Sequence, residues 1–241
     1  MTKVKICGIT NFEDASAATE AGADLLGFIF YEPSPRYVMP ESVREIVSGI
    51  KSQALTARYQ TLPKFVGVFV NAPLETVAHI LDYCQLDAVQ LHGEESVEFV
   101  NYFMPRAFKA LRPESAKRAK ALVQKYTQSP DAATPGRDNV SNYKLPSLLI
   151  DAFHPTLYGG TSHVTDWTMA ANIARRQPIM LAGSLTLANV AEAIRAVQPW
   201  GVDVSSGVEV AKGKKDQAKV KEFVKVTKGG SSPSDTVGVL E

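Results

Sequence analysis

Eight short apolar runs alternate with amphipathic stretches along almost the whole chain, and this alternation restricts the possible folds more than any other feature. The runs lie near residues 3–7, 24–30, 65–70, 86–91, 106–111, 147–151, 178–182 and 200–204. Residues 25–30 (LLGFIF) are apolar at consecutive positions, which is typical of parallel strands covered on both faces. The pattern shows no break in composition. It therefore predicts one α/β domain over residues 1–228, a (β/α)8 TIM barrel with a parallel eight-stranded core.

The stretches between the runs carry helix signals. Thr10 and Glu13 have the spacing of a capping box, and residues 71–73 (NAP) predict the start of the third helix. The third helix has one apolar stripe at helical spacing, made of Leu74, Val77, Ala78, Leu81 and Cys84. Cys84 is therefore expected in the core, as is Phe223 on the last helix.

Two polar segments and the tail interrupt the pattern. Residues 51–64 lengthen the connection before the third strand, and residues 128–146 contain several Pro and Gly residues and are interpreted as an exposed loop. Both segments precede strands, so we expect them on the barrel face opposite the usual active site. Residues 229–241 are rich in Gly, Ser and Pro, which predicts a disordered tail.

The charge balance argues against several classes of partner. The chain has 26 basic and 25 acidic residues, a formal net charge of +1, which favours neither nucleic acid nor a membrane surface. No apolar stretch approaches the roughly 18 residues of a transmembrane helix, and the N-terminus shows no signal pattern. Two cysteines do not make a disulfide framework, so we expect a cytoplasmic protein.

Chemically active side chains stand where two of the predicted strands end. Cys7 ends the first strand and Asp151 ends the sixth, and in a (β/α)8 barrel the catalytic groups follow the C-terminal ends of strands. A thiolate can remove a proton from carbon while a carboxylic acid protonates an oxygen, which is the pair an isomerase needs. The alternatives remain open at this stage: Cys7 as a small buried apolar residue, and Asp151 as a helix cap.

Other loops on the same face offer groups for binding an anion. Arg36, after the second strand, can grip a carboxylate or phosphate, or else pair with Glu32 or Glu41 on the surface. Small residues follow the seventh and eighth strands, where such barrels usually hold phosphate at a helix N-terminus: Gly183, Ser184, Ser205, Ser206 and Gly207. Residues 158–162, including Gly160, are interpreted as a lid. The loops after earlier strands show no comparable pair, so one phosphate is favoured over two.

The histidines do not suggest a metal site. His79, His92, His154 and His163 lack metal-ligand spacing and have no cysteine cluster beside them. His92 alone follows a strand directly, and it is interpreted as structural. The chain contains no P-loop and no dinucleotide fingerprint.

These motifs together resemble a known family. The carriers are residues 5–10 (KICGIT), 27–30 (GFIF), 34–37 (SPRY), 66–71 (VGVFVN), 89–94 (VQLHGE), 149–151 (LID), 158–161 (YGGT) and 201–209 (GVDVSSGVE). Their order and their positions at the strand ends resemble the phosphoribosylanthranilate isomerase family of tryptophan biosynthesis over residues 3–228.

The resemblance implies an intramolecular oxidoreductase that performs an Amadori rearrangement. N-(5-phosphoribosyl)anthranilate would become 1-(2-carboxyphenylamino)-1-deoxyribulose 5-phosphate, with Cys7 as general base, Asp151 as general acid and Arg36 holding the anthranilate carboxylate. The substrate nitrogen supplies the electron sink, so no metal or organic cofactor is implied. Gln90 and Asp203 are expected to contact or orient the substrate. The partner is then a small phosphorylated substrate, and the protein a monomer or homodimer.

The chain departs from the family pattern in two phosphate loops. Ser162 and Ser184 stand where the family usually has glycine, and His163 follows the first of them. If Ser184 adopts a positive φ it carries backbone strain, although its hydroxyl can donate to phosphate. Two alternatives are kept: a catalytically silent phosphosugar-binding barrel, which only these altered loops support, and an aminoaldose isomerase of histidine biosynthesis. The second would call for carboxylates on both the first and sixth strands, and for two phosphate sites.

Overall fold

The structure, a computed structural model, describes residues 1–55, 59, 61–127, 145–152 and 165–229. Eight parallel strands close into a barrel in sequence order: β1 (Lys3–Cys7), β2 (Leu25–Ile29), β3 (Lys64–Phe69), β4 (Ala88–Leu91), β5 (Ala107–Leu111), β6 (Leu148–Ile150), β7 (Ile179–Leu181) and β8 (Gly201–Val204). All eight predicted strands are present, with bounds that differ by at most two residues. The predicted (β/α)8 fold is confirmed.

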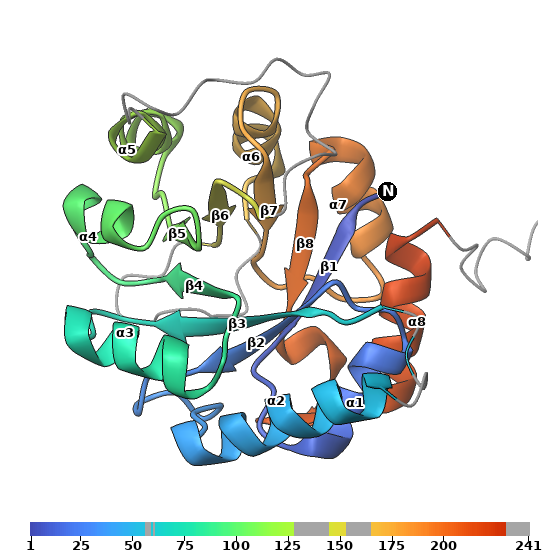
Figure 1. Cartoon of the computed structure of the whole chain (residues 1–241). Helices are drawn as coiled ribbons and strands as arrows, with labels where there is room; N and C mark the ends of the chain where they lie inside the picture. The colour runs from blue at the N-terminus through green and yellow to red at the C-terminus, as the bar shows by residue number, and fades with distance from the viewer. Residues whose placement is uncertain (56–58, 60, 128–144, 153–164, 230–241) are drawn as a thin grey trace, which may run out of the picture.

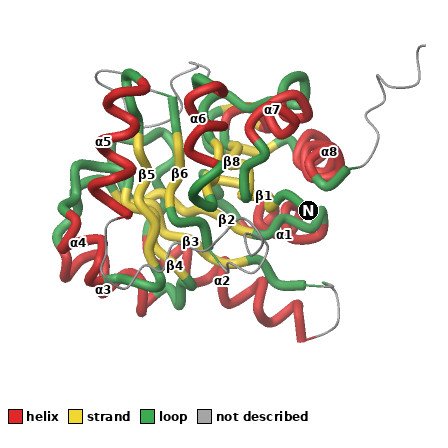
Figure 2. The backbone as a smooth tube through the Cα atoms, turned by 90° about the horizontal axis from the view of Figure 1, so that it is seen from above, coloured by secondary structure: helices red, strands yellow, loops and turns green. Residues whose placement is uncertain are grey.

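The helices lie around the barrel, as Figures 1 and 2 show. They are α1 (Phe12–Glu20), α2 (Pro40–Leu55), α3 (Leu74–Tyr83), α4 (Val97–Tyr102), α5 (Ala116–Thr127), α6 (Trp167–Ala174), α7 (Val190–Val197) and α8 (Gln217–Thr227). None of the helices in the described part of the chain combines the length and the apolar character that a bilayer crossing requires.

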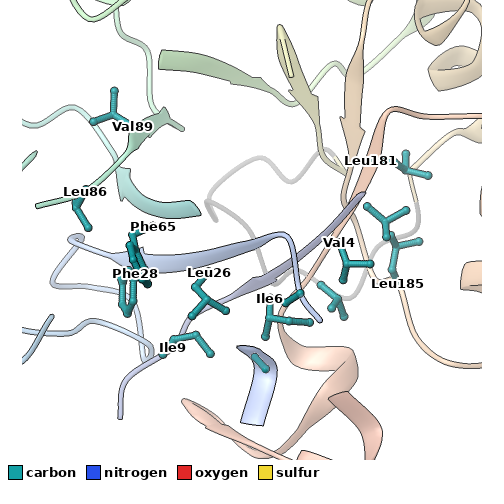
Figure 3. Close-up of a cluster of buried hydrophobic side chains, with 14 of the residues drawn as sticks. Val4, Ile6, Ile9, Leu26, Phe28, Phe65, Leu86, Val89, Leu181 and Leu185 are labelled. Carbon is teal, nitrogen blue, oxygen red and sulfur yellow. The ribbon is translucent and has the colours of Figure 1, made fainter. Parts of the chain in front are cut away.

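Alternation along each strand divides the core into two layers. The larger cluster lies between strands and helices; Figure 3 shows part of it, including Val4, Ile6 and Leu26 from β1 and β2. The smaller cluster takes the residues of opposite parity and fills the barrel interior: Leu25, Val66, Ala88, Phe108, Ala110, Leu149, Met180, Ala182 and Trp200. Because side chains alternate with period two, Lys5 and Cys7 on β1 also point into the interior.

The predicted capping box is wrong in its details. Asn11, not Thr10, caps α1 by accepting a hydrogen bond from the backbone N–H of Asp14, while the Thr10 hydroxyl donates to the Gly213 carbonyl. The helix α3 starts at Leu74, directly after the proline of the predicted start.

Cys84 and Phe223 are fully buried, as predicted. Residues 51–55 continue α2, so the predicted insertion before β3 begins only after Leu55. The described part of the other predicted loop is limited to residues 145 and 146, and residues 230–241 of the tail lie outside the described residues.

A short hairpin between β8 and α8 was not predicted. A 3₁₀ turn, η2 (Ser206–Val208), leads into β9 (Glu209–Ala211), which pairs in antiparallel fashion with β10 (Lys214–Lys215). The backbone N–H of Lys215 donates to the Asp14 side chain at 2.8 Å, which ties this hairpin to α1. The hairpin matters below because Glu209 and Lys215 lie beside the pocket.

Candidate active site

A pocket of about 320 Å³ opens at the C-terminal mouth of the barrel. The sequence-predicted residues that line it are Cys7, Arg36, Gln90, Asp151, Gly183, Ser184, Asp203, Ser205 and Ser206. They come from the ends of β1, β4, β6, β7 and β8 and from the loops that follow β2, β7 and β8. The structure therefore brings together groups that are up to about 200 positions apart in the sequence, at the face where such barrels place their sites.

Cys7 lies beside a buried ion pair formed by Lys5 and Asp203. Its neighbour two residues earlier, Lys5, is fully buried and its Nζ contacts Asp203 Oδ1 at 2.8 Å. The strand register explains this contact, since Lys5 pairs with Asp203 across β1 and β8, while Cys7 pairs with Gly27 across β1 and β2. A side chain on Gly27 would collide with both groups, because its Cβ would lie 2.8 Å from Cys7 Sγ and 3.0 Å from Lys5 Nζ.

The ionisation of Cys7 is set by opposing influences. Burial raises the pKa of the thiol above its ordinary value, and the positive charge of Lys5 opposes this rise. The negative charge of Asp203 raises the same pKa further, and the charge of Lys215 lowers it. Cys7 is therefore a protonated thiol in the free protein, and the stability of its thiolate form depends on the nearby cations.

Asp151 is buried in the same pocket, directly after β6 and beside His92. Its Oδ1 accepts a hydrogen bond from the backbone N–H of Ala152 at 2.8 Å, and its Oδ2 lies 3.4 Å from His92 Nε2. The other imidazole nitrogen, Nδ1, lies 2.9 Å from Gln90 Nε2. With the amide donating to Nδ1, the imidazole proton sits on Nε2 and faces Asp151.

His92 therefore contacts the predicted acid, which its interpretation as a structural residue did not anticipate. Among the described residues, Gln90 Oε1 is buried without a hydrogen-bond partner. Such an atom costs free energy unless a ligand or water satisfies it, and it belongs to a residue that lines the pocket.

Arg36 does not pair with either of the carboxylates considered from the sequence. Its Nε and Nη2 donate to the two carboxylate oxygens of Glu209, each at 2.8 Å. Lys215 Nζ contacts Glu209 Oε1 at 2.9 Å and the Ser205 carbonyl at 3.2 Å. Burial alone would raise the pKa of Glu209, but the hydrogen bonds from Arg36 and the charge of Lys215 hold it below its ordinary value.

Glu209 thus occupies the edge of the guanidinium formed by Nε and Nη2, the side-on edge. The end-on edge, formed by Nη1 and Nη2, is left for a ligand. Arginine can present two parallel N–H donors along either edge, so Arg36 can still grip a second carboxylate with Nη1 and Nη2. Glu209 fixes which edge is available.

The loop after β7 has the backbone that its glycine and serine suggest. Gly183 has a φ of 94°, and a Cβ there would collide with the Thr165 hydroxyl. Ser184 has a φ of 50°, so it does occupy a left-handed position. No described residue accepts a hydrogen bond from the backbone N–H of either one. The Asn189 amide donates to the Ser184 carbonyl at 3.0 Å and stabilises the loop.

The loop after β8 packs against it. A Cβ on Gly207 would collide with the Leu185 carbonyl, so only glycine allows the two loops to approach. The helix termini differ from expectation: α7 begins at Val190, six residues beyond Ser184, and the turn after Ser205 is the short η2. Any phosphate here would be held by loop N–H groups and hydroxyls more than by a helix N-terminus.

Gly160 and the rest of the predicted lid, residues 158–162, lie outside the described residues. In the part of the chain that the structure describes, no group of three or more His, Cys, Asp or Glu side chains has the geometry of a metal site.

Sequence reasoning missed Lys5, Glu209, Lys215 and the contact of His92 with Asp151. The parity of β1 was a usable signal for Lys5, since a lysine two residues before an inward cysteine must also point inward. No sequence signal links Arg36 to Glu209, which is 173 residues away.

A closed parallel barrel with a thiol and a carboxyl in one pocket at its C-terminal mouth belongs to the class of barrel proteins equipped for acid–base chemistry. The family model "N-(5'phosphoribosyl)anthranilate (PRA) isomerase" matches residues 4–226, and the chain belongs to that family of enzymes.

Relatives with this name cover the chain almost completely. The N-(5'-phosphoribosyl)anthranilate isomerase of Pelobacter propionicus is 43% identical over 237 residues, with 97% of this chain and 99% of the relative covered. That of Geotalea uraniireducens is 46% identical, with 95% and 100% covered. The crystal structure of the enzyme from Thermotoga maritima is 36% identical, with 95% and 100% covered and a TM-score of 0.77.

Another crystal structure shows a phosphoribosyl anthranilate isomerase in complex with reduced 1-(o-carboxyphenylamino)-1-deoxyribulose 5-phosphate. It is 36% identical to this chain, with 95% of this chain and 100% of that chain covered and a TM-score of 0.74.

Proposed function

We propose that the pocket performs the reaction of the family on N-(5-phosphoribosyl)anthranilate, with Cys7 as general base and Asp151 as general acid. The chain is an isomerase of tryptophan biosynthesis, and its product is 1-(2-carboxyphenylamino)-1-deoxyribulose 5-phosphate. The single observation that carries the residue assignment is the placement of a thiol and a carboxyl in one pocket at the strand ends. A ligand between them can receive a proton on one side and lose one on the other.

The proton steps balance within the site. Asp151 donates a proton to the furanose ring oxygen, the bond from that oxygen to C1′ breaks, and the substrate nitrogen forms an iminium with C1′. The Cys7 thiolate then removes the proton from C2′, which gives an enolamine. In the tautomerisation of the enolamine to the ketone, C1′ gains a proton and the 2′ hydroxyl loses one. No electrons leave or enter the substrate, so the change is a rearrangement.

His92 supports the assignment of the acid. Its Nε2 lies 3.4 Å from Asp151 Oδ2, beyond the usual length of an N–H···O hydrogen bond but close enough to interact with the charge of the carboxylate after ring opening. Both catalytic groups must begin in states opposite to their ordinary order, since a free Asp has a pKa of about 3.9 and a free Cys of about 8.5. The site must therefore use a minor protonation state of the pair or the charges of the substrate.

The two ends of the substrate fit two parts of the pocket. Arg36 presents its end-on edge for the anthranilate carboxylate. The loops after β7 and β8 take the single phosphate with four residues that line the pocket, Gly183, Ser184, Ser205 and Ser206, and with the neighbouring Gly207, which does not line it. Gln90 and Asp203 line the pocket between them and are assigned to the ribose hydroxyls. The unpartnered Oε1 of Gln90 is an acceptor for such a hydroxyl.

The partner and the location complete the proposal. The ligand is a small phosphorylated molecule, as in the complex of the relative described above. The predicted monomer or homodimer remains a prediction, and the dimeric enzyme of Thermotoga maritima supports the homodimer. Cys7 and Cys84 are both free thiols, which suits the reducing cytoplasm that we propose as the location.

Turnover of freshly generated phosphoribosylanthranilate, followed by the decay of its fluorescence, tests the assignment. We expect Cys7→Ser and Asp151→Asn each to lower kcat by about 10²–10⁴, because each removes one proton transfer. Their thermal unfolding should stay close to wild type. Wild-type kcat in either variant would remove that residue from the mechanism. Binding of phosphate ligands without turnover in the wild type would instead support the silent-barrel alternative.

A further inference from the structure

Lys5 is a fully buried lysine for which the roles proposed above give no function. Its side chain lies inside the barrel, on the same strand and the same face as Cys7. Burying an ammonium is costly unless a negative group compensates it, so its presence at this position calls for a physical reason. The inference below rests on the proposed role of Cys7.

The space above Gly27 holds both side chains. A point at the position of an added Cβ would lie 2.8 Å from Cys7 Sγ and 3.0 Å from Lys5 Nζ, with the Cε of Lys5 at 3.1 Å. Any side chain at Gly27 would collide with both groups, so glycine at this position leaves room for the ammonium and the sulfur. The register across β1 and β2 places Cys7 directly opposite Gly27, so the arrangement is built into the sheet.

Asp203 holds the ammonium from the other side. The Oδ1 of Asp203 lies 2.8 Å from Lys5 Nζ, and the carboxylate is nearly buried. This contact uses one of the three ammonium donors, and no backbone carbonyl among the described residues accepts from the other two. The ammonium is therefore fixed in position by Asp203, and its remaining interaction is with the Cys7 sulfur, whose hydrogen bond raises the pKa of Lys5 and lowers that of Cys7.

We propose that Lys5 is a positioning residue that stabilises the negative charge of the Cys7 thiolate during the reaction, with Asp203 fixing its ammonium. Lys5 stays protonated throughout and transfers no proton. The Cys7 thiolate takes the proton from C2′ and becomes a neutral thiol, and its next ionisation restores the negative charge beside the same cation.

The other charged groups near Cys7 do not replace Lys5 in this role. Lys215 and Arg36 face it from β10 and from the loop after β2, but both are bonded to Glu209. Asp203 raises the pKa of the thiol, and the Asp151–His92 pair lines the same pocket. Of the positive charges, Lys5 has the largest lowering influence on the pKa of Cys7.

The decisive measurement is the ionisation of Cys7 in the free protein, which requires no turnover. The thiolate absorbs in the far ultraviolet, and the difference between each protein and its Cys7→Ser counterpart isolates this one residue. Cys84, whose pKa is raised by burial to about 11, is present in both members of each pair, so its ionisation cancels in the difference. For Lys5→Met we expect the pKa of Cys7 to rise by about 1–3 pH units. The value of kcat at neutral pH should fall by a matching factor, about tenfold for each unit.

Lys3→Met is the matched control. Lys3 is on the same strand and makes the same kind of contact, Nζ to Asp24 Oδ1 at 2.8 Å. Its side chain is half exposed, and it is the first residue of the strand, at the end opposite Cys7. Its removal should leave the pKa of Cys7 and kcat unchanged. A shift as large as that of Lys5→Met would overturn the proposal, because the effect would then belong to any lysine on β1.

A second variant covers loss of folding. Lys5→Met leaves Asp203 buried without its cation, which can destabilise the protein. The double variant with Lys5→Met and Asp203→Asn removes both charges. Since Lys5 influences the thiol more than Asp203 does, the pKa of Cys7 should still lie above the wild-type value. A wild-type pKa in the folded single or double variant would overturn the proposal.

The experiment separates this inference from the proposed function. If Cys7→Ser keeps full turnover while Lys5→Met shifts the thiol, the assignment of the base fails and the coupling of the two side chains stands. If Cys7→Ser is inactive and Lys5→Met leaves the thiol unchanged, the base assignment stands and the role of Lys5 is overturned.

Discussion

Lys5 and Lys109 are both buried lysines on strands of the same barrel, yet they lie on opposite faces of its wall. Lys5 points into the interior, whereas Lys109 has the outward parity of β5, since Phe108 and Ala110 belong to the inner cluster. Lys109 Nζ donates to the carbonyls of Leu91, Gly93 and Ala110 at 2.8–2.9 Å and lies 3.3 Å from Glu95 Oε2. All three of its donors are used.

The two lysines also differ in how the surroundings affect their charge. Burial lowers the pKa of Lys109, and the charge of Glu95 only partly opposes it. Burial alone would lower the pKa of Lys5 as well, but the charges of Asp203 and Cys7 raise it above its ordinary value. A lysine with every donor satisfied by backbone supports the fold. A lysine held between two acidic groups keeps its positive charge and can stabilise a negative charge on either of them.

Removing Lys109 should have the largest effect on stability. Lys109→Met leaves Glu95 buried without its cation and three carbonyls without their donor, so we expect a loss of about 3–5 kcal/mol in the free energy of unfolding. Urea denaturation followed by circular dichroism measures it. At 25 °C the kcat of the folded protein should stay near wild type. A fall in kcat as large as that of Lys5→Met would break the comparison.

The pH dependence of this variant sharpens the same prediction. Because the folded-state pKa of Lys109 lies below its ordinary 10.5, the unfolded chain binds more protons between the two values. This residue therefore makes wild-type stability rise as the pH increases through the folded pKa toward 10.5. The stability of Lys109→Met should lack that rise, so the difference in unfolding free energy between wild type and variant should grow with pH over this range. A parallel pH dependence in both proteins would contradict the prediction.

The fold was predictable from the sequence because local signals repeat along the chain. Each strand is a continuous apolar run, and eight runs with helices between them leave few alternatives to a closed parallel barrel. The strand ends also placed Cys7 and Asp151 on one face. The inward position of Lys5 also follows from the alternation of side chains along β1, because Lys5 is two residues before Cys7. A lysine is normally expected on a solvated face, which hides this signal.

The contacts between distant loops were not predictable in the same way. The partner of Arg36 is Glu209, on a hairpin too short to show a periodic pattern, and the nearby Glu32 was an equally plausible choice. The capping of α1 shifted by one residue because the Thr10 hydroxyl is used by Gly213 across the barrel rim. These choices depend on tertiary distances, which the order of residues does not specify.

A substitution of Glu209 tests whether Arg36, like the two lysines, is controlled by the partners of its donors. Glu209→Gln removes the charge that fixes the side-on edge of the guanidinium at two 2.8 Å contacts. The end-on edge is then less well oriented for the substrate carboxylate, and KM should rise about tenfold while kcat changes little. Steady-state kinetics with phosphoribosylanthranilate measures both values.

Glu32→Gln is the control for that substitution. Glu32 is exposed on the same loop as Arg36 and was one of its expected partners, so its removal should leave KM unchanged. Equal effects of the two variants would mean that net charge near the pocket, and not the fixed edge of Arg36, sets the affinity.

Substitutions of Ser184 have the smallest expected effect. They compare the cost of its strained backbone with the contribution of its hydroxyl to phosphate binding. At a φ of 50° a serine carries strain that glycine avoids, so Ser184→Gly should raise the free energy of unfolding by about 0.5–1 kcal/mol. The same change removes a hydroxyl from the predicted phosphate loop. Ser184→Ala keeps the strain and removes only the hydroxyl, so any rise in KM shared by both variants measures the hydroxyl. If KM is unchanged in both while stability rises in the glycine variant alone, Ser184 contributes strain without binding phosphate.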